Sequence, residues 1–384
     1  MLRASDLELI INLRKELHKY PELSGREEMT SRRIARFLEE LGPNRLICGI
    51  GGNGLAARFC GSAPGPRVLV RAELDALPVN EENDFDYRSV NKGVSHACGH
   101  DGHMAVAAGV AKYYAEKRPE KGELVILFQP SEENGKGAEQ VIHDPVFEAL
   151  RPDYFIAMHN LPGYGKNEII LKEGVFAMAS VGLIAALDGK TSHAAEPENG
   201  ISPAHAVSRL LDELPRLADR KEFGSFTLAT VIHARLGEIA FGTSPGHAVV
   251  MATLRACEDS EMDMLTDIAE KLVSRIAEEE GLKSSVSFDE RFPSTVNDRH
   301  LAKLAGETAG ELGLKVNEKK DAFRWSEDFG WFTKESRGLL FGIGAGKGHP
   351  ELHNPDYDFP DDITATGVEM LVRLVDRLLE EENG

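Results

Sequence analysis

Short apolar runs alternate with helical stretches along most of this chain, and this alternation constrains its fold more than any other feature. The runs are VLVRA at 68–72, LVILF at 124–128, YFIAM at 154–158 and GLLFGIG at 338–344. Strands that alternate with helices build the sheet of an α/β protein, and the helices cover that sheet. The pattern therefore predicts an α/β domain.

Helices near both ends of the chain belong to the same pattern. Ser5-Asp6-Leu7-Glu8 fits a capping box and is followed by apolar residues at helical spacing, which predicts a first helix. A second helix is predicted from about 27 to 41, where Gly42 and Pro43 stop it. Two more are expected near 298–312 and from about 361 to 381.

The order of elements changes in the middle of the chain. Expected there, in order, are a strand, a helix, two strands, a helix and a strand, at 180–187, 203–217, 226–234, 248–255, 261–280 and 284–288. This βαββαβ order is that of a ferredoxin-like domain. We therefore predict a discontinuous domain of residues 1–177 and 293–384, with residues 178–292 inserted as a second domain.

Composition excludes several classes of protein. A chain of 384 residues, 42% of them apolar, can bury the cores of two domains. With 44 basic and 63 acidic side chains the net charge is -19, which would repel nucleic acid. No run approaches the ~18 apolar residues of a membrane span, so no membrane partner is expected.

The location of the protein is inferred from its start and its cysteines. The first residues, MLRASDLELIINLRKELHKY, mix charged with apolar residues, unlike a signal peptide. The four cysteines are too few and too scattered for a disulfide framework, which indicates a reducing compartment. We expect a soluble, cytoplasmic protein.

Residues able to bind metal or move protons follow four of the predicted strands. Open α/β sheets place their sites beyond the carboxyl ends of the strands, so these residues are expected to meet. They are Glu73 and Asp75, then Gln129, Glu132 and Glu133, then His159, and finally His349 and His353.

The densest cluster is HACGHDGH at 96–103, at the start of an apolar helix. Its imidazole, thiolate and carboxylate groups are ligands of zinc or manganese, and Cys98 with His100 could bind one ion or bridge two. The alternative is a capped helix start with a buried cysteine. Three histidines in one tight turn favour the metal site, because histidine is seldom placed there for packing alone.

Glu132 and Glu133 form the second important pair. Adjacent carboxylates in a loop can diverge, so that one coordinates a metal and the other faces outward as a proton shuttle; a solvated charge pair is the alternative. A metal lowers the pKa of bound water from about 15.7 to about 7, and a nearby glutamate can pass the proton to a leaving amine. The combination indicates metal-assisted hydrolysis.

Seven segments, in order along the chain, carry a family pattern. They are HKYPEL at 18–23, RAELDALP at 71–78, residues 96–103, FQPSEE at 128–133, GKTSHA at 189–194, SEDF at 326–329 and LHNP at 352–355. With them the chain resembles the amidohydrolase branch of the M20 metallopeptidases. That branch includes N-acyl-amino-acid amidohydrolases, hippurate hydrolases, plant auxin-conjugate hydrolases and N-acetyldiaminopimelate deacetylases.

This resemblance implies a fold and a set of roles. The fold would be a zinc-exopeptidase-like mixed sheet flanked by helices, with the inserted ferredoxin-like domain serving as lid and dimerisation surface. The implied ligands of one or two divalent ions (zinc, manganese, nickel or cobalt) are Cys98, His100, Glu133, His159 and His353, with the Cys98 thiolate shared.

Three further residues take implied roles in catalysis. Glu132 would be the general base, and Asp75 would support the metal ligands from behind. His193 would stabilise the oxyanion of the tetrahedral intermediate, and in related proteins this histidine can come from the second subunit of a dimer. The implied reaction is cleavage of the amide bond of an N-acyl amino acid or a related small conjugate.

Two departures from the family pattern and two alternatives are kept open. Glu73 stands where the family usually has Asp, and Gly242 where it usually has Asn beside the substrate. The chain could instead be a catalytically silent homologue that binds an acylated amino acid, or a dipeptidase or carboxypeptidase of the same family. Gly242 is the main support for the silent homologue.

The remaining candidates have weaker signals. His103 is expected to orient the cluster through a hydrogen bond, while His349 could be a plain loop residue. Arg255 could receive a substrate carboxylate bidentately, and Trp325 could wall the site or pack in a core. The other histidines, expected on the surface or packed, are His143, His205, His233, His247 and His300.

Overall fold

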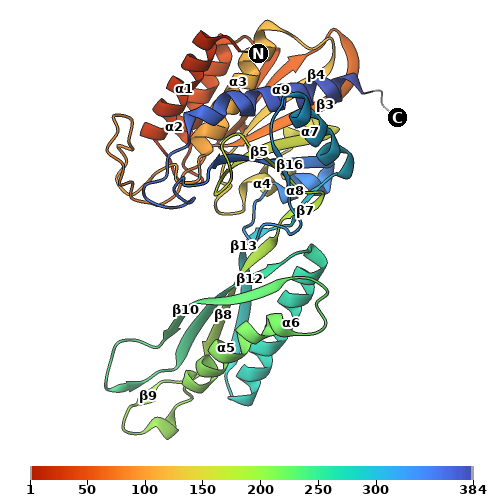
Figure 1. Cartoon of the computed structure of the whole chain (residues 1–384). Helices are drawn as coiled ribbons and strands as arrows, with labels where there is room; N and C mark the ends of the chain where they lie inside the picture. The colour runs from red at the N-terminus through yellow and green to blue at the C-terminus, as the bar shows by residue number, and fades with distance from the viewer. Residues whose placement is uncertain (1, 382–384) are drawn as a thin grey trace. The chain divides into compact units, whose positions relative to one another are not determined.

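The computed structural model describes residues 2–381 as a mixed α/β protein with two compact units (Figure 1). The larger unit comprises Met1–Phe176, Thr295–Asp321 and Asp328–Gly384, and the smaller unit Ala177–Ser294 and Ala322–Glu327. The segment 322–327 was predicted in the larger domain. It lies in the smaller unit because its backbone pairs there: the Met178 amide donates to Phe323 O, and Arg255 donates to Arg324 O.

An eight-stranded mixed sheet forms the centre of the larger unit. Its order is β1-β2-β4-β3-β5-β16-β6-β15, and β4, β3, β5 and β16 are parallel neighbours. The bounds are β1 Arg45–Ile50, β2 Gly54–Cys60, β3 Ala63–Glu73, β4 Lys121–Gln129, β5 Tyr154–Pro162, β6 Ile169–Leu171, β15 Val316–Glu318 and β16 Arg337–Gly346. The four predicted strands are β3, β4, β5 and β16, so the predicted fold class is confirmed.

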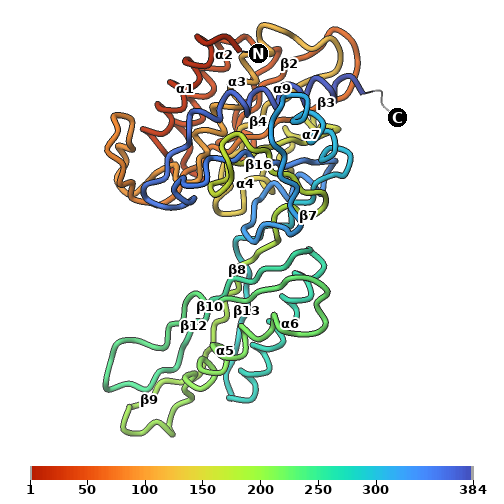
Figure 2. Tube along the Cα trace, viewed as in Figure 1, coloured from red at the N-terminus to blue at the C-terminus, as the bar shows by residue number. Residues whose placement is uncertain are grey.

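Helices pack on both faces of this sheet. Figure 2 shows α3 beside α1 and α9, which come from opposite ends of the chain. On that face Val68 and Val70 of β3 belong to the main apolar core. Phe155 of β5 lies outside this core and contacts the rings of Phe147 and Phe332. The bounds are α1 Ala4–Lys19, α2 Glu28–Glu40, α3 His100–Glu116, α4 Gly137–His143, α7 Arg299–Glu311, α8 Gly330–Glu335 and α9 Thr364–Glu380.

The first helix begins earlier than its sequence predicts. Ser5 is already helical, the N-cap is Arg3, and no side chain caps this end. The Arg3 carbonyl accepts from the amides of Asp6 and Leu7, and the Arg3 side chain pairs with Asp6. The predicted capping box at Ser5 is therefore wrong, because the N-cap lies two residues earlier, at Arg3, whose side chain pairs with Asp6.

The smaller unit has the βαββαβ order. Its four-stranded sheet is ordered β10-β12-β8-β13, with every neighbouring pair antiparallel, and both helices contribute to a separate apolar core. The bounds are β8 Ala179–Asp188, α5 Ala204–Arg216, β10 Thr227–Leu236, β12 His247–Ala256, α6 Asp259–Glu279 and β13 Lys283–Phe292. Two-residue strands β9, Ser192–His193, and β11, Thr243–Ser244, pair nearby. No helix within residues 2–381 is long and apolar enough to span a membrane.

Candidate metal centre

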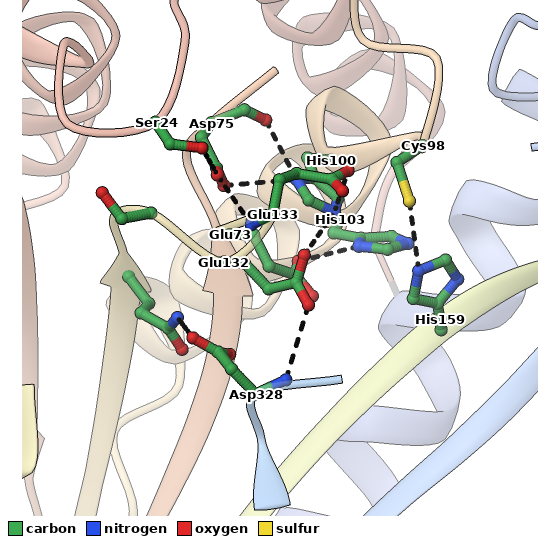
Figure 3. A network of polar contacts seen from close by, with 12 residues as sticks. Ser24, Glu73, Asp75, Cys98, His100, His103, Glu132, Glu133, His159 and Asp328 are labelled. Atoms are coloured by element: carbon green, nitrogen blue, oxygen red, sulfur yellow. Dashed lines mark hydrogen bonds and ion pairs between the residues drawn. The ribbon is translucent and has the colours of Figure 1, made fainter. Parts of the chain in front are cut away.

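The carboxyl ends of neighbouring parallel strands bring the predicted residues to one edge of the sheet (Figure 3). Glu73 ends β3, and Asp75 follows it. Glu132 and Glu133 follow β4. His159 lies inside β5 rather than after it, since that strand continues to Pro162.

A tight turn delivers the residues at the start of α3. Gly99 is the N-cap with φ of +87°, a left-handed conformation that glycine adopts readily. A Cβ at this position would lie 2.0 Å from Asn160 Oδ1, so no larger residue fits without movement. The turn places Cys98 just before the helix and His100 as its first residue, both buried.

The five predicted ligands lie together, and we call them the ligand cluster: Cys98, His100, Glu133, His159 and His353. Cys98 Sγ lies 3.5 Å from His159 Nε2, and the two oxygens of Glu133 lie 3.8 Å from His100 Nε2 and from His353 Nε2. Their ligand atoms form two groups, Cys98–His100–His159 and Cys98–Glu133–His353, each within 4.8 Å. Cys98 belongs to both groups, so this arrangement fits two ions that share a thiolate.

Hydrogen bonds orient two of the imidazole rings. The His100 Nδ1–H donates to the Asp75 carbonyl at 2.9 Å, and the His159 Nδ1–H donates to the Asn160 carbonyl at 2.8 Å. A proton held on Nδ1 leaves the Nε2 lone pair for a metal. Among residues 2–381, His100 Nε2 has no hydrogen-bond partner. The orientation of these rings therefore fits metal ligands.

Asp75 supports the cluster from behind. Its carboxylate is fully buried and accepts from the Ser24 hydroxyl at 2.7 Å and from the Glu133 amide at 3.0 Å. Burial by itself would raise the pKa of Asp75, but the hydrogen bond and charge of His100 lower it overall. Asp75 is thus an anion that fixes both the Glu133 backbone and the His100 ring.

Glu132 lies beside the ligand cluster, as Figure 3 shows. Its Oε2 is 3.9 Å from His100 Nε2, and its Oε1 is 3.5 Å from the Asp328 amide. The side chain is buried, and it groups with His100 and Glu133 within 4.8 Å. A carboxylate at this distance can exchange a proton with a water molecule held by the cluster.

Glu73 and His103 form a supporting pair. Glu73 accepts from Arg71 and, at 2.8 Å, from His103 Nδ1, while His103 Nε2 accepts from the Asn160 amide. Both ring nitrogens of His103 are thus engaged in hydrogen bonds. These bonds fit the orienting role that its place in the sequence suggested. The longer Glu73 side chain, where the family usually has Asp, contacts both partners.

The electrostatics of the site favour a bound cation. Burial lowers the pKa of His100, but the charge of Glu73 and the hydrogen bond and charges of Asp75 and Glu133 outweigh it and raise the pKa to about 10. Several buried carboxylates therefore surround one imidazole that they hold protonated. Sulfur, imidazole and carboxylate donors in this charge balance fit one or two divalent ions.

A second buried cluster, which the sequence analysis missed, adjoins the first. We call it the charge-paired cluster: Arg14, His18, Glu81, Asp101 and Asp358. His18 contacts Asp101 at 2.9 Å and Glu81 at 3.0 Å. Arg14 contacts Asp101 at 3.1 Å and Asp358 at 2.6 Å. The HKYPEL segment was a signal for His18, but nothing in the sequence paired it with Asp101.

Other candidates contact residues outside the ligand cluster. His349 Nε2 donates to the Asp358 carbonyl at 2.6 Å. Trp325 stacks on Phe323 with ring centroids 4.8 Å apart, in the smaller unit. The five remaining histidines are exposed, as expected of surface residues: His143, His205, His233, His247 and His300.

His193 and Gly242 lie near each other in the smaller unit, where β9 pairs with β11. His193 Nδ1 accepts from the Ala195 amide at 3.0 Å, which leaves the ring proton on Nε2. The Gly242 carbonyl accepts from the Ala194 amide at 3.0 Å. Nothing lies within 4 Å of a Cβ built on Gly242, so an Asn side chain would fit there.

Comparisons with known proteins find similarity along most of the chain. The model of peptidase family M20/M25/M40 matches residues 69–377. The chain is 30% identical over 377 residues to an N-acetylcysteine deacetylase of Bacillus subtilis, covering 97% of each chain. It is 28% identical over 366 residues to an N-acetyldiaminopimelate deacetylase of Bacillus velezensis, covering 95% of this chain and 97% of that one.

One solved structure with a similar fold is of a metal-binding protein. A dinuclear metal-binding M20 peptidase of Bacillus subtilis superposes with a TM-score of 0.84 at 25% identity, covering 99% of both chains. The predicted fold and the expectation of one or two divalent ions are confirmed by this similarity.

Proposed function

This chain belongs to peptidase family M20/M25/M40, and from that premise we propose that it releases the acyl group from N-acyl amino acids, N-acetyl amino acids first among them. It is a metal-dependent hydrolase of amide bonds. The observation that carries the proposal is the ligand cluster with the buried carboxylate of Glu132 beside it. The relatives named above as deacetylases of N-acetylated amino acids support the substrate class.

The ligand cluster would hold the metal through the Cys98 thiolate, the Glu133 carboxylate and the three imidazoles. A bound divalent ion supplies a Lewis acid that polarises the substrate carbonyl and lowers the pKa of water. Sulfur and imidazole donors favour zinc, and the carboxylate also accommodates manganese, nickel or cobalt. We expect zinc or manganese.

The side chains divide the proton transfers among them. Glu132 takes a proton from the attacking water and returns it to the nitrogen of the leaving amine. Asp75 keeps His100 and Glu133 in place through the hydrogen bonds described above. His193 carries its proton on Nε2 and would donate it to the carbonyl oxygen as negative charge develops there.

Arg255 is the candidate receptor for the substrate carboxylate. Its guanidinium donates to Arg324 O at 2.8 Å and to Ser326 Oγ at 2.9 Å, both neutral oxygens. Burial lowers its pKa. A carboxylate from an amino-acid substrate would give this cation a counter-charge and could bind it bidentately.

A substrate panel with a matched pair of variants tests the proposal. Amine release is measured from N-acetyl, N-benzoyl and N-indolylacyl amino acids and several dipeptides, metal-free and with zinc or manganese. Glu132→Gln should lower turnover by roughly 10² to 10⁴ and keep its metal, while exposed Glu40→Gln should match the wild type. A silent homologue would bind the panel without turnover in either protein, and a peptidase would prefer the dipeptides.

We also propose a homodimer through the smaller unit. Strand β10 lies at the edge of its sheet and exposes Ile232 and Leu236, at 59% and 41%. An exposed apolar edge strand is a ready surface for pairing with a second copy. Ile232→Lys should convert the dimer to a monomer in light scattering, whereas a monomeric wild type would refute the proposal.

A cytoplasmic location is proposed from the chemistry of the chain. Within the described residues no disulfide joins its four cysteines, and a Cys98 thiolate needs a reducing environment. The net charge of -19 argues against nucleic acid and acidic membrane surfaces as partners. Fractionation of cells that express the protein at native level would test this location.

A further inference from the structure

The turn that presents Glu132 has an unfavourable backbone conformation. Ser131, the residue before Glu132, has φ of +55°. This left-handed region is sparsely populated by residues other than glycine, and it persists only where the surroundings hold it. Something other than the strand β4, which ends at Gln129, must therefore fix the direction in which Glu132 leaves the sheet.

The buried carboxylate of Glu27 holds this turn. Glu27 is 0% exposed and precedes α2. Its Oε1 accepts from the Ser131 amide at 2.9 Å and lies 3.4 Å from the Ser131 hydroxyl. The same oxygen accepts from the Gly25 amide at 2.7 Å, and Oε2 accepts from the Asn53 side-chain amide at 2.9 Å.

The loop between α1 and α2 is thus linked to the catalytic turn in two ways, directly through Glu27 and indirectly through Ser24 and Asp75. Glu27 bonds to Ser131 on one side of Glu132, and Ser24 bonds to Asp75, which accepts the Glu133 amide on the other side. Since Ser24 and Glu27 are three residues apart, one short loop secures both flanks of the base. This loop is remote in sequence from the turn that it contacts.

We propose that Glu27 is a positioning residue for the general base: acting through Ser131, it keeps Glu132 aimed at the water that the reaction uses. This inference rests on the proposed function of Glu132. A charged acceptor is needed because hydrogen bonds to an ionised carboxylate are roughly twice as strong as those to a neutral amide. A glutamine of the same shape would hold the turn less firmly.

A double-mutant cycle with Ser131→Gly tests this role. Glu27→Gln in the metal-loaded enzyme should lower kcat about 10-fold to 100-fold and leave KM within about twofold, because a misplaced base affects the transition state rather than substrate binding. Glycine adopts a positive φ without strain, so Ser131→Gly should reduce the loss caused by Glu27→Gln at least fivefold.

Glu22→Gln is the matched control on the same loop. Glu22 Oε2 accepts from the amide and hydroxyl of Thr30 at 2.7 and 2.8 Å, so this carboxylate ties the loop to α2. This variant should keep kcat while lowering the melting temperature. The positioning role is refuted if Glu27→Gln keeps its kcat as Glu22→Gln does. It is also refuted if Glu27→Gln lowers kcat by the same factor in the Ser131→Gly background as in the wild type.

Hydrogen exchange separates this inference from the proposed function. Glu27→Gln should speed amide exchange in the segment 131–137 at least fivefold and leave α3 and β5 unchanged. This readout needs no turnover. An inactive wild type would count against the proposed function alone, whereas unchanged exchange at 131–137 would overturn the role of Glu27.

Discussion

Two buried polar clusters meet at the start of α3, and they differ in the source of the positive charge that balances their carboxylates: side chains in one and a bound ion in the other. His100 belongs to the ligand cluster, and the next residue, Asp101, belongs to the charge-paired cluster. Both contain ligand-type side chains within 4.8 Å, since His18, Asp101 and Asp358 also form such a group. By residue type alone either could be a metal site.

The charge-paired cluster supplies its own cations. Both ring nitrogens of His18 contact carboxylates, and Arg14 bridges Asp101 and Asp358. Burial lowers the pKa of His18, but Asp101 and its other partners raise it to about 9. Buried charges are tolerated when each is paired and hydrogen-bonded, as these are.

The ligand cluster, by contrast, includes no arginine or lysine, and the carboxylates of Glu73, Asp75 and Glu133 all act on the His100 imidazole. His100 Nε2 lacks a hydrogen-bond partner among the described residues. Donor types and short distances therefore do not distinguish a metal site from an ion network. The distinction comes from whether the protein itself neutralises the anions, and the following experiments test it.

The largest effect is expected from His100→Asn. Loss of a partner that only orients a ligand costs about 10-fold to 100-fold in metal affinity, so loss of this ligand should exceed 100-fold and abolish turnover. Metal affinity is measured by competition with a chelator. Exposed His143→Asn is the control and should bind as the wild type does; affinity within threefold of wild type for His100→Asn would refute the ligand assignment.

Asp101→Asn should affect folding instead of metal affinity. It removes the carboxylate shared by Arg14 and His18, two cations that are 0% exposed. Breaking a buried ion pair costs about 3 to 5 kcal/mol, measured as the free energy of unfolding in urea. Asp267→Asn, on an exposed pair with Lys271, should cost less than about 1 kcal/mol. Equal costs would mean that the charge-paired cluster is not a stabilising network.

The stability of the charge-paired cluster should fall at alkaline pH. The pKa of His18 rises from 6.5 to about 9 on folding, so its stabilisation is complete below pH ~6.5 and is lost as pH rises through ~9. The stability difference between the wild type and His18→Gln should shrink by about 3 kcal/mol between pH 6 and pH 10. A difference independent of pH would show that His18 is neutral in the fold.

The two clusters also differ in how far the sequence predicts them. The sequence predicted that the residues of the ligand cluster would meet, because Cys98 and His100 lie in one dense segment and the other candidates follow recognisable apolar runs. The charge-paired cluster was missed because its members come from distant segments, and only packing of α1 on α3 brings Arg14 and His18 to Asp101. Glu27 was missed for the same reason.

The fold shows the same division between local and long-range signals. Buried strands such as β3 were predicted because VLVRA is apolar on both faces. In contrast, β2 was not predicted, although most of it is buried: GLAARFC has small residues and no clear period, and its pairing with β4 places it in the sheet. The strands β6 and β15, the last two at one end of the sheet, have three residues each, too few to give a pattern.

The smallest effect is expected in the number of protons that the protein releases when it binds a metal ion. Because the pKa of His100 is about 10 without metal, an ion must displace its proton near neutral pH, and affinity should rise up to about tenfold per pH unit. Cys98 also binds a metal only as the thiolate. Calorimetry in buffers of different ionisation enthalpy counts these protons. His18→Gln should release the same number, because the charge-paired cluster exchanges no proton with the metal; a changed number would mean that the two clusters act as one.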